Sequence, residues 1–258
     1  MNNLNLKNIT ENLIETFLKA GKIAKEISLR GIKITIKNDK TPVTDGDLAV
    51  DKLLREKIAE ITPKIPIISE ETVDIQKSNE NKTFWLIDPI DGTKDYIKKR
   101  DEYTLNAALI LNLEPCIGII YAPAKNRLFY SHGEGFAYEL YEERKKNLNC
   151  KKKNINDVIA LANSDITPDD ILKIYKENNV TKIIKMSSSL KFCTLAAGEA
   201  DIYAAKARAF EWDIAAGHAI LKHAGGMLTT LEGKNFLYGK KNYKNLPLMA
   251  KRAENLKK

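Results

Sequence analysis

Apolar side chains recur at helical spacing in the N-terminal region. They predict a long amphipathic helix over residues 8–29, whose apolar face carries Leu13, Ile14, Phe17, Leu18, Ile23, Ala24 and Ile27. Apolar and polar residues then alternate over residues 33–37, which indicates a strand. After a polar loop that carries Asp47, we expect a second amphipathic helix with an apolar side formed by Leu48, Leu54, Ile58 and Ile61.

Between residues 104 and 140 the pattern becomes strand-like. Apolar runs at 104–111, 116–121, 127–130 and 136–140 are separated by short segments rich in turn-forming residues. Strands joined through such short turns pair antiparallel, so we expect a meander.

The C-terminal part alternates strands with helices. Strands are expected at 158–161 and 182–186, and Thr167-Pro168-Asp169-Asp170 opens a helix between them with an N-cap and a first-turn proline. This order predicts a β–α–β unit. Further along, we expect a helix from Ser189 to Ala197, a strand over 201–205 and a helix that begins at Asp213.

A lysine-rich segment, residues 144–154, separates the β-rich part from the C-terminal part. We therefore expect an N-terminal lobe over residues 1–146 and a C-terminal lobe over 147–258. The 258 residues carry a formal net charge of +8, but the lysines are not interleaved with aromatic side chains as in single-strand nucleic-acid binders. The positive surface favours anionic small molecules and permits a weak, non-specific attraction to nucleic acid or acidic lipid.

Cysteine content and hydropathy indicate the compartment. Cys116, Cys150 and Cys193 lie in apolar surroundings and are too few for a disulfide framework or a zinc cluster, which fits a reducing cytosol. The N-terminus lacks a signal pattern, and no apolar run approaches the roughly 20 residues of a bilayer span. We expect a cytoplasmic protein without a transmembrane segment, with at most peripheral contact with the inner membrane.

Two carboxylates directly follow an apolar segment: Trp85, Leu86 and Ile87 precede Asp88 and Asp91 in the sequence Trp85-Leu86-Ile87-Asp88-Pro89-Ile90-Asp91-Gly92-Thr93. Burying two like charges costs several kcal/mol unless a cation lies between them, so Asp88 and Asp91 form a candidate metal site with the Ile90 carbonyl as a third oxygen. The N–H groups of Gly92 and Thr93 begin a short helix and can face an anion. An Asp-Gly surface turn is the simpler alternative, and the spacing alone does not decide between the two.

Carboxylates in three other segments favour the metal site. Glu70-Glu71 ends an apolar run, and Asp213 begins a helix of small residues. Asp47 is a site residue or a helix N-cap, and both roles can hold because N-capping uses one side-chain oxygen. Every side-chain donor is an oxygen, which selects Mg²⁺ or Mn²⁺ over Zn²⁺. We expect Glu71 to be a solvated neighbour and leave it out of the ligand set.

Together these segments resemble the inositol monophosphatase superfamily of magnesium-dependent, lithium-sensitive phosphatases. The family patterns V-T-x-x-D, E-E, W-x-x-D-P-x-D-G-T and W-D-x-A-A-G appear here in the same order, at 43–47, 70–71, 85–93 and 212–217. The resemblance covers nearly the whole chain. It implies an α+β fold built as a layered α-β-α-β-α sandwich, with the active site between the lobes.

The resemblance also implies roles for individual residues. The metal ligands would be Glu70, Asp88, the Ile90 carbonyl, Asp91 and Asp213. They would hold two or three Mg²⁺ ions, with Mn²⁺ as a substitute, and two such ions can clamp the attacking and leaving oxygens of an in-line displacement. Glu70 and Thr93 would activate the attacking water, with Asp47 accepting a hydrogen bond from Thr93.

One further segment bears on which phosphate is the substrate, namely Ser187-Ser188-Ser189-Leu190-Lys191-Phe192-Cys193. It resembles S-S-L-K-F-C of the bacterial 3′(2′),5′-bisphosphate nucleotidases, where inositol phosphatases usually have small apolar residues in place of Lys-Phe. Hydroxyl groups at a helix N-terminus and a lysine one turn later form a second anion site, whereas an N-cap is the simpler alternative. Adenosine 3′,5′-bisphosphate is the favoured substrate, and the implied substrate-binding residues are Glu70, Ile90, Asp91, Gly92, Thr93, Ser189, Lys191 and Asp213.

Two segments depart from the nucleotidase pattern. Asp165 in Ala162-Asn163-Ser164-Asp165 replaces a histidine of a Ser-Arg-Ser-His-like segment, and Lys206-Ala207-Arg208-Ala209 replaces a loop that contains Gly-Pro. A phosphatase for inositol or another sugar monophosphate is therefore the alternative. A catalytically inactive relative that binds nucleotide or RNA would lack a metal ligand, and all are present. We expect the protein to bind a small phosphate substrate and no specific nucleic acid. We expect it to be a monomer or a homodimer.

Overall fold

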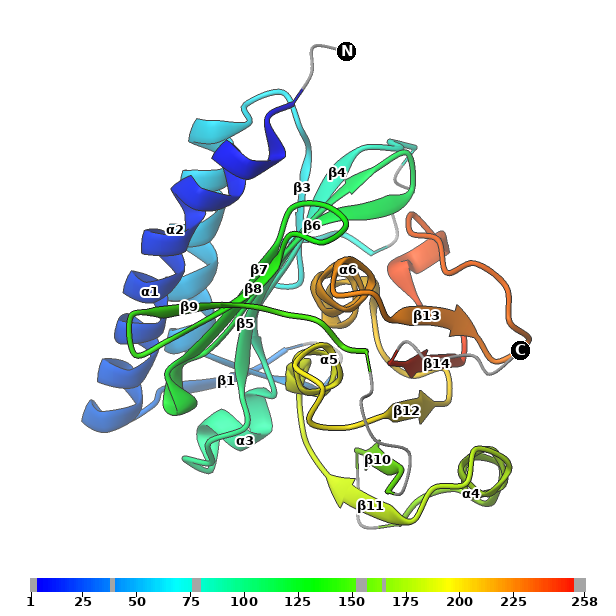
Figure 1. Ribbon diagram of the computed structural model, residues 1–258. Coiled ribbons are helices and arrows are strands. Elements are labelled where there is room, and N and C mark those ends of the chain that lie inside the picture. Colours follow the sequence, from blue (N-terminus) through cyan, green and yellow to red (C-terminus); the bar gives the residue numbers. More distant parts are fainter. Residues whose placement is uncertain (1–3, 38–39, 76–79, 152–156, 164–165, 253–258) are drawn as a thin grey trace.

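The computed structural model describes residues 4–37, 40–75, 80–151, 157–163 and 166–252. Its elements form five layers, in the order helices, sheet, helices, sheet, helix (Figure 1). The layered α-β-α-β-α sandwich expected from the sequence is therefore confirmed. Asp39, residues 152–154 and Asp165 lie outside the described residues.

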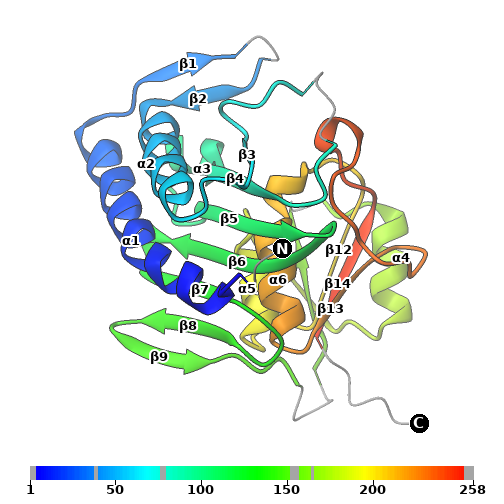
Figure 2. The ribbon, with the colours of Figure 1, turned by 90° about the horizontal axis from the view of Figure 1, so that it is seen from above.

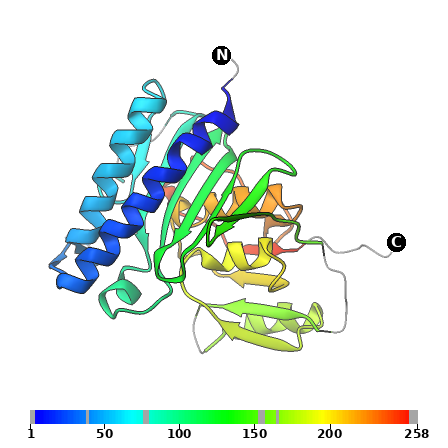
Figure 3. The same cartoon turned by 60° about the vertical axis from the view of Figure 1, so that its left-hand side comes forward.

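The first layer is a pair of helices, α1 (Leu6–Arg30) and α2 (Asp45–Ile61), which lie side by side over one face of the larger sheet (Figures 1 and 3). The long helix expected over residues 8–29 is confirmed. In α2 the expected apolar face is partly wrong, because Leu48 is 52% exposed while Val50 is fully buried beside Leu54 and Ile58. The chain between these helices forms the strands β1 (Ile34–Ile36) and β2 (Pro42–Thr44), which pair as a two-stranded antiparallel sheet.

The second layer is a seven-stranded sheet of order β3-β4-β5-β6-β7-β8-β9. The expected meander is confirmed from β5 to β8, and every neighbouring pair except β3 and β4 is antiparallel. The strand bounds are β3 (Ile67–Ser69), β4 (Phe84–Asp91), β5 (Thr104–Leu111), β6 (Glu114–Ala122), β7 (Arg127–Ser131), β8 (Ala137–Tyr141) and β9 (Arg144–Asn147). The short helix α3 (Thr93–Ile97) follows β4, and the 3-10 turn η1 (Pro123–Lys125) follows β6.

Side chains of β4 are buried on both faces of this sheet. Trp85 and Ile87 pack in the hydrophobic cluster with α1 and α2, whereas Phe84 and Leu86 belong to the cluster on the other face. Because successive side chains of a strand point to opposite faces, Asp88 lies on the same face of the sheet as Phe84 and Leu86, away from α1 and α2. The acidic residue is thus directed to the interior of the sandwich.

The middle layer consists of α5 (Leu190–Ala196) and α6 (Ala215–His223), which lie between the two sheets (Figures 1 and 2). The helix α6 packs closely against β6 at Gly118. A Cβ atom at this glycine would lie 2.3 Å from the Ala216 carbonyl oxygen. The 3-10 turn η2 (Glu211–Asp213) leads into α6, so Asp213 precedes the helix of small residues as expected.

The second sheet has five strands in the order β11-β10-β12-β14-β13. Its strand bounds are β10 (Ile159–Ala162), β11 (Lys182–Lys185), β12 (Ile202–Ala205), β13 (Met227–Thr230) and β14 (Leu248–Lys251), and the 3-10 turn η3 (Lys241–Tyr243) precedes β14. Strands β10 and β11 are parallel and joined through α4 (Asp169–Glu177), which confirms the β–α–β unit. The N-cap of α4 is Pro168 rather than Thr167.

The predicted lobe boundary falls at the end of a strand. Because β9 runs to Asn147 and pairs with β8, the larger sheet includes the first residues of the lysine-rich segment. One hydrophobic cluster joins Phe129 of the larger sheet with Phe192 of α5 and Leu228 of the smaller sheet. The two parts therefore share a core, and their division into lobes at 146 stays a prediction.

Candidate metal and phosphate site

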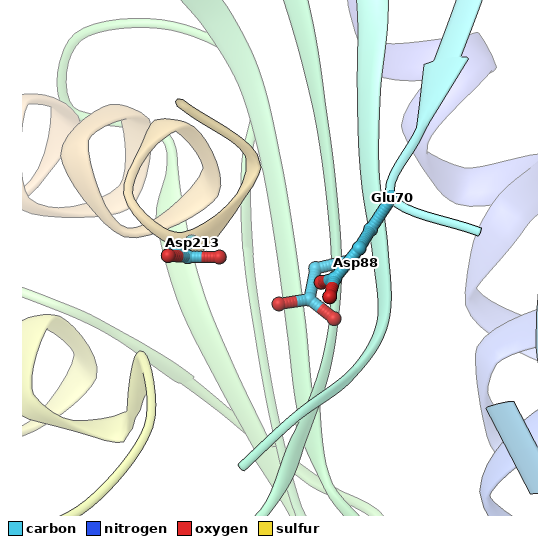
Figure 4. A group of neighbouring side chains, drawn as sticks. All are labelled: Glu70, Asp88 and Asp213. Carbon is cyan, nitrogen blue, oxygen red and sulfur yellow. The ribbon is translucent and has the colours of Figure 1, made fainter. Parts of the chain in front are cut away.

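Three carboxylates from separate segments meet between the larger sheet and η2. Oxygen atoms of Glu70, Asp88 and Asp213 all lie within 4.8 Å of one another. Glu70 directly follows β3, Asp88 lies within the neighbouring parallel strand β4, and Asp213 faces them from η2, just before α6 (Figure 4). Among the described residues, this cluster brings together three of the ligands implied by the sequence.

The strand β4 positions Asp88 through an irregularity in its pairing. The register of β4 and β5 shifts between Asp88 and Asp91, where Pro89 has no N–H to donate. Asp88 is 2% exposed, and its Oδ1 atom has no hydrogen-bond partner among the described residues. Since a buried acceptor without a partner costs about 1–3 kcal/mol, more when charged, this oxygen is suited to a ligand that the protein does not supply.

Burial dominates the electrostatics of the cluster. It raises the pKa of Glu70 to about 7, and it raises the pKa values of Asp88 and Asp213 well above their usual range. Repulsion among the neighbouring carboxylates raises them further. A divalent cation would remove this cost, and a cluster that contains only oxygen donors fits Mg²⁺ or Mn²⁺.

Asp91 does not join the three-carboxylate cluster. Its Oδ2 accepts hydrogen bonds from the backbone N–H and the hydroxyl of Ser189, each at 2.6 Å. The Ser189 hydroxyl is also 2.5 Å from the Asp213 carbonyl oxygen, and Ser189 is only 1% exposed. The Ser189 contact therefore differs from the one implied by the sequence: the side chain holds Asp91 in place instead of facing the cleft.

Thr93 and Asp47 lie together, as the resemblance implied. The Thr93 hydroxyl is 3.1 Å from the Ile90 carbonyl oxygen and 3.4 Å from Asp47 Oδ1, so its single proton can be donated to either. Asp47 Oδ2 accepts the N–H of Thr44, which is the actual N-cap of α2. Asp47 is thus the N3 residue of a capping box rather than the N-cap itself, and its other oxygen is directed to Thr93.

Lys37 contacts the acidic cluster from the β1–β2 sheet. Its Nζ is 2.7 Å from Glu71 and 3.7 Å from Glu70, and its pKa is raised by these carboxylates although burial opposes the shift. The Glu71 side chain is 4% exposed, so the expectation of a solvated neighbour is wrong. This pair could not be predicted from local sequence, because Lys37 follows β1 whereas Glu71 lies in the turn after β3.

A cleft of about 360 Å³ opens over the acidic residues. Its lining includes Glu70, Asp91, Thr93 and Asp213 together with Lys191. Gly92, which has φ +93°, begins α3 here, and a Cβ atom at this position would lie 3.2 Å from the Glu102 carbonyl oxygen. Glycine therefore permits the backbone turn that directs β4 into α3.

Lys191 is a buried cation in the lining of this cleft. It is 5% exposed, and burial lowers the pKa of its ammonium to about 8 despite the nearby Asp91 carboxylate. Its Nζ donates to the carbonyl oxygens of Ser188 and Met186, the latter at 3.4 Å. The ring of Tyr203 lies 5.3 Å from Nζ.

Three polar residues of the site were not singled out from the sequence as functional. Asn106 donates to the Ser189 hydroxyl at 3.0 Å, and it could have been noticed as the one amide within an apolar strand. Asn163 and Arg208 line the cleft and belong to the two segments that depart from the nucleotidase pattern, but neither residue was itself assigned a ligand contact.

Comparison with known proteins agrees with this fold. The model of the inositol monophosphatase family matches residues 5–256. The 3′(2′),5′-bisphosphate nucleotidase CysQ of Buchnera aphidicola is 40% identical over 217 residues, which cover 82% of this chain and 79% of that protein. Its counterpart in Escherichia coli strain K12 is 34% identical over 213 residues, 80% of this chain and 82% of that protein.

A solved structure is also similar. CysQ from Bacteroides thetaiotaomicron, described as a bacterial member of the inositol monophosphatase family, superimposes with a TM-score of 0.79 and 30% identity, covering 97% of this chain and 99% of that one. The chain therefore belongs to the inositol monophosphatase family. It is a phosphatase by this membership. In the described part of the chain, no helix has the length and apolar character to cross a membrane.

Proposed function

We propose that the protein is a Mg²⁺-dependent phosphatase that removes the 3′-phosphate of adenosine 3′,5′-bisphosphate, which yields AMP and inorganic phosphate. The observation that carries this proposal is the joint presence, in one cleft, of a three-carboxylate cluster and the buried ammonium of Lys191. The cluster suits a metal-assisted attack on one phosphate, and the ammonium suits a second phosphate. The nucleotidases named above support the choice of substrate.

The oxygens that would hold Mg²⁺ come from the cluster and from β4. We assign them to Glu70, Asp88, the Ile90 carbonyl, Asp91 and Asp213. For Asp91 we assign Oδ1, because Ser189 occupies Oδ2. When bound, the ions would neutralise the carboxylates and the substrate phosphate and lower the pKa of the attacking water.

The protein's own groups would orient that water and accept its proton. Glu70 lies beside Asp88 and Asp213, and its carboxylate would accept the proton of the attacking water. The Thr93 hydroxyl donates its proton to the Ile90 carbonyl or to Asp47, so its oxygen would accept a hydrogen bond from the same water. We infer that Ser189 is a positioning residue, since its two hydrogen bonds fix the orientation of Asp91.

A phosphatase for inositol or another sugar monophosphate is the second candidate. It is favoured by the fact that Lys191 already donates to two carbonyl oxygens, so part of its hydrogen-bonding capacity is met without a second phosphate. Asn163 and the 206–209 segment also differ from the nucleotidase pattern. We further propose that the enzyme is inhibited by Li⁺ and acts in the cytoplasm.

A phosphate-release panel tests the choice of substrate. It compares adenosine 3′,5′-bisphosphate, adenosine 2′,5′-bisphosphate, inositol 1-phosphate and fructose 1,6-bisphosphate at one Mg²⁺ concentration. We expect the highest kcat/KM for adenosine 3′,5′-bisphosphate. A higher kcat/KM for inositol 1-phosphate would replace the nucleotidase proposal with the sugar phosphatase.

A further inference from the structure

Two polar side chains of β5 lie opposite the two carboxylates of β4. Thr104 and Asn106 are the polar residues of an otherwise apolar strand. In the pairing of the two strands, Asn106 is the register partner of Asp88. Thr104 is likewise the register partner of Asp91. Because register partners of an antiparallel pair point to the same face of the sheet, Asp88 and Asn106 are neighbours on the face that carries the acidic cluster.

Both residues are buried and incompletely hydrogen-bonded. Asn106 is 1% exposed, and Thr104 is fully buried. Neither Asn106 Oδ1 nor the Thr104 hydroxyl has a hydrogen-bond partner among the described residues, and the same holds for Asp88 Oδ1. A buried polar atom without a partner is destabilising, so unpaired polar atoms on two adjacent strands indicate a ligand that the chain itself does not supply.

The contacts of the Asn106 amide fix its orientation. Its Nδ2 lies 3.0 Å from the Ser189 hydroxyl oxygen and 3.5 Å from Asp91 Oδ2. That hydroxyl also contacts two acceptors, namely Asp91 Oδ2 and the Asp213 carbonyl oxygen. The hydroxyl donates its one proton to an acceptor and therefore accepts an N–H from Asn106. The reverse orientation would place the amide oxygen beside the Asp91 carboxylate, so the nitrogen lies toward Ser189 and Oδ1 stays unpaired.

The unpaired oxygens of Asp88 and Asn106 differ in charge. A carboxylate oxygen such as that of Asp88 suits direct contact with a hard cation, whereas the amide oxygen of Asn106 is a neutral acceptor. Mg²⁺ loses its hydration shell reluctantly and keeps several water molecules, each of which has protons to donate. A neutral acceptor buried beside a carboxylate ligand therefore suits a water molecule of this shell. Groups that hold the ligands of a metal from outside in this way tune its affinity.

We propose that Asn106 is a positioning residue of the metal site. Its Nδ2 holds the Ser189 hydroxyl and, through it, Asp91, while its Oδ1 accepts a hydrogen bond from a water molecule in the hydration shell of the cation. This inference rests on the proposed function, because it requires a divalent cation at the acidic cluster. Asn106 does not touch the reacting atoms, and its contribution is to the affinity for Mg²⁺.

The test is the Kd for Mg²⁺, measured by isothermal titration calorimetry on metal-free protein without substrate, together with the Tm of the metal-free protein. Asn106→Leu removes both hydrogen-bonding groups and keeps a side chain of similar size. We expect its Kd to rise about 10- to 100-fold, which is the usual cost of losing such an outer contact. Asn106→Asp keeps an oxygen at this position and should bind Mg²⁺ at least as tightly as the unmodified protein.

A matched control removes a buried hydrogen bond elsewhere in the same sheet. Ser131 of β7 is fully buried, and its hydroxyl lies 2.9 Å from His223 Nδ1, at the opposite end of α6 from Asp213. Ser131→Ala should lower the Tm and leave the Kd for Mg²⁺ unchanged. A purely structural role of Asn106 would give the same result, so the Kd separates positioning from fold stability.

The Kd values distinguish the outcomes. A Kd of Asn106→Leu equal to that of the unmodified protein overturns the proposal, whether or not the Tm falls. If Asn106→Leu does not fold, Asn106→Asp decides, because weaker Mg²⁺ binding by a variant that retains the oxygen contradicts the proposal. Unmodified protein that binds Mg²⁺ but releases no phosphate from adenosine 3′,5′-bisphosphate would refute the proposed function and leave the result for Asn106 valid.

Discussion

Replacing Lys191 with methionine should remove the selectivity for a second phosphate while preserving the packing of α5. An ammonium has three N–H bonds, and the carbonyl oxygens of Ser188 and Met186 account for two of them. One donor therefore remains for a phosphate oxygen. A hydrogen bond between charged groups contributes about 1.5–3 kcal/mol, so kcat/KM for adenosine 3′,5′-bisphosphate should fall roughly 10- to 150-fold.

The assay is the ratio of kcat/KM for adenosine 3′,5′-bisphosphate to that for adenosine 3′-monophosphate, measured by phosphate release. The two substrates differ only in the 5′-phosphate, so Lys191→Met should lower the ratio and leave the monophosphate value nearly unchanged. Because the pKa of Lys191 is about 8, the unmodified enzyme should lose the same selectivity as the pH rises through this value and the ammonium loses its proton. The control is Lys173→Met on the exposed face of α4, which should change neither of the two kcat/KM values.

Equal loss of activity on both substrates would refute this reasoning. Lys191 would then act through the fold, and a lower Tm of the variant would show it. An unchanged ratio would remove the main support for the nucleotidase and favour the sugar phosphatase.

Other predictions concern the metal cluster and the packing. Asp213→Asn should lower kcat at least about 100-fold, as expected when one preorganised electrostatic group is lost, and should abolish the rise in Tm caused by Mg²⁺; a variant within tenfold of the parent would contradict the assignment. The pKa of Glu70 is raised from 4.5 to about 7, so folding favours the protonated carboxyl; the chelator-treated protein should lose Tm as the pH rises from about 4.5 through about 7, and Mg²⁺ should reverse that loss. Li⁺ should inhibit phosphate release at constant Mg²⁺, and undiminished activity at high Li⁺ would exclude the proposed sensitivity. Gly118→Ala should lower the free energy of unfolding by about 1–3 kcal/mol, because its Cβ meets the Ala216 carbonyl oxygen at 2.3 Å, and unchanged urea denaturation would contradict this packing.

Local periodicity predicted much of the fold. The helix α1 and the meander β5 to β8 follow from side-chain spacing and turn residues that lie close together in the chain. The strands β13 and β14 were not predicted. They are short, and β14 pairs with β12 across more than one intervening element, so their pairing depends on contacts distant in sequence.

The candidate site was likewise predicted in part from local sequence. The acidic motifs identified Glu70, Asp88 and Asp213 because each carboxylate ends or interrupts an apolar segment. The contact of Ser189 with Asp91 joins residues 98 positions apart and cannot be inferred from local spacing. Likewise, the pairing of Lys37 with Glu71 follows only once β1, β2 and β3 are placed in space.

The most direct test of the account is phosphate release from adenosine 3′,5′-bisphosphate by metal-free protein, before and after Mg²⁺ is added back. The cluster of Glu70, Asp88 and Asp213 predicts no release above the uncatalysed rate in the presence of a chelator, and full recovery on addition of Mg²⁺. Undiminished release in the chelator would show that these carboxylates do not act through a metal ion.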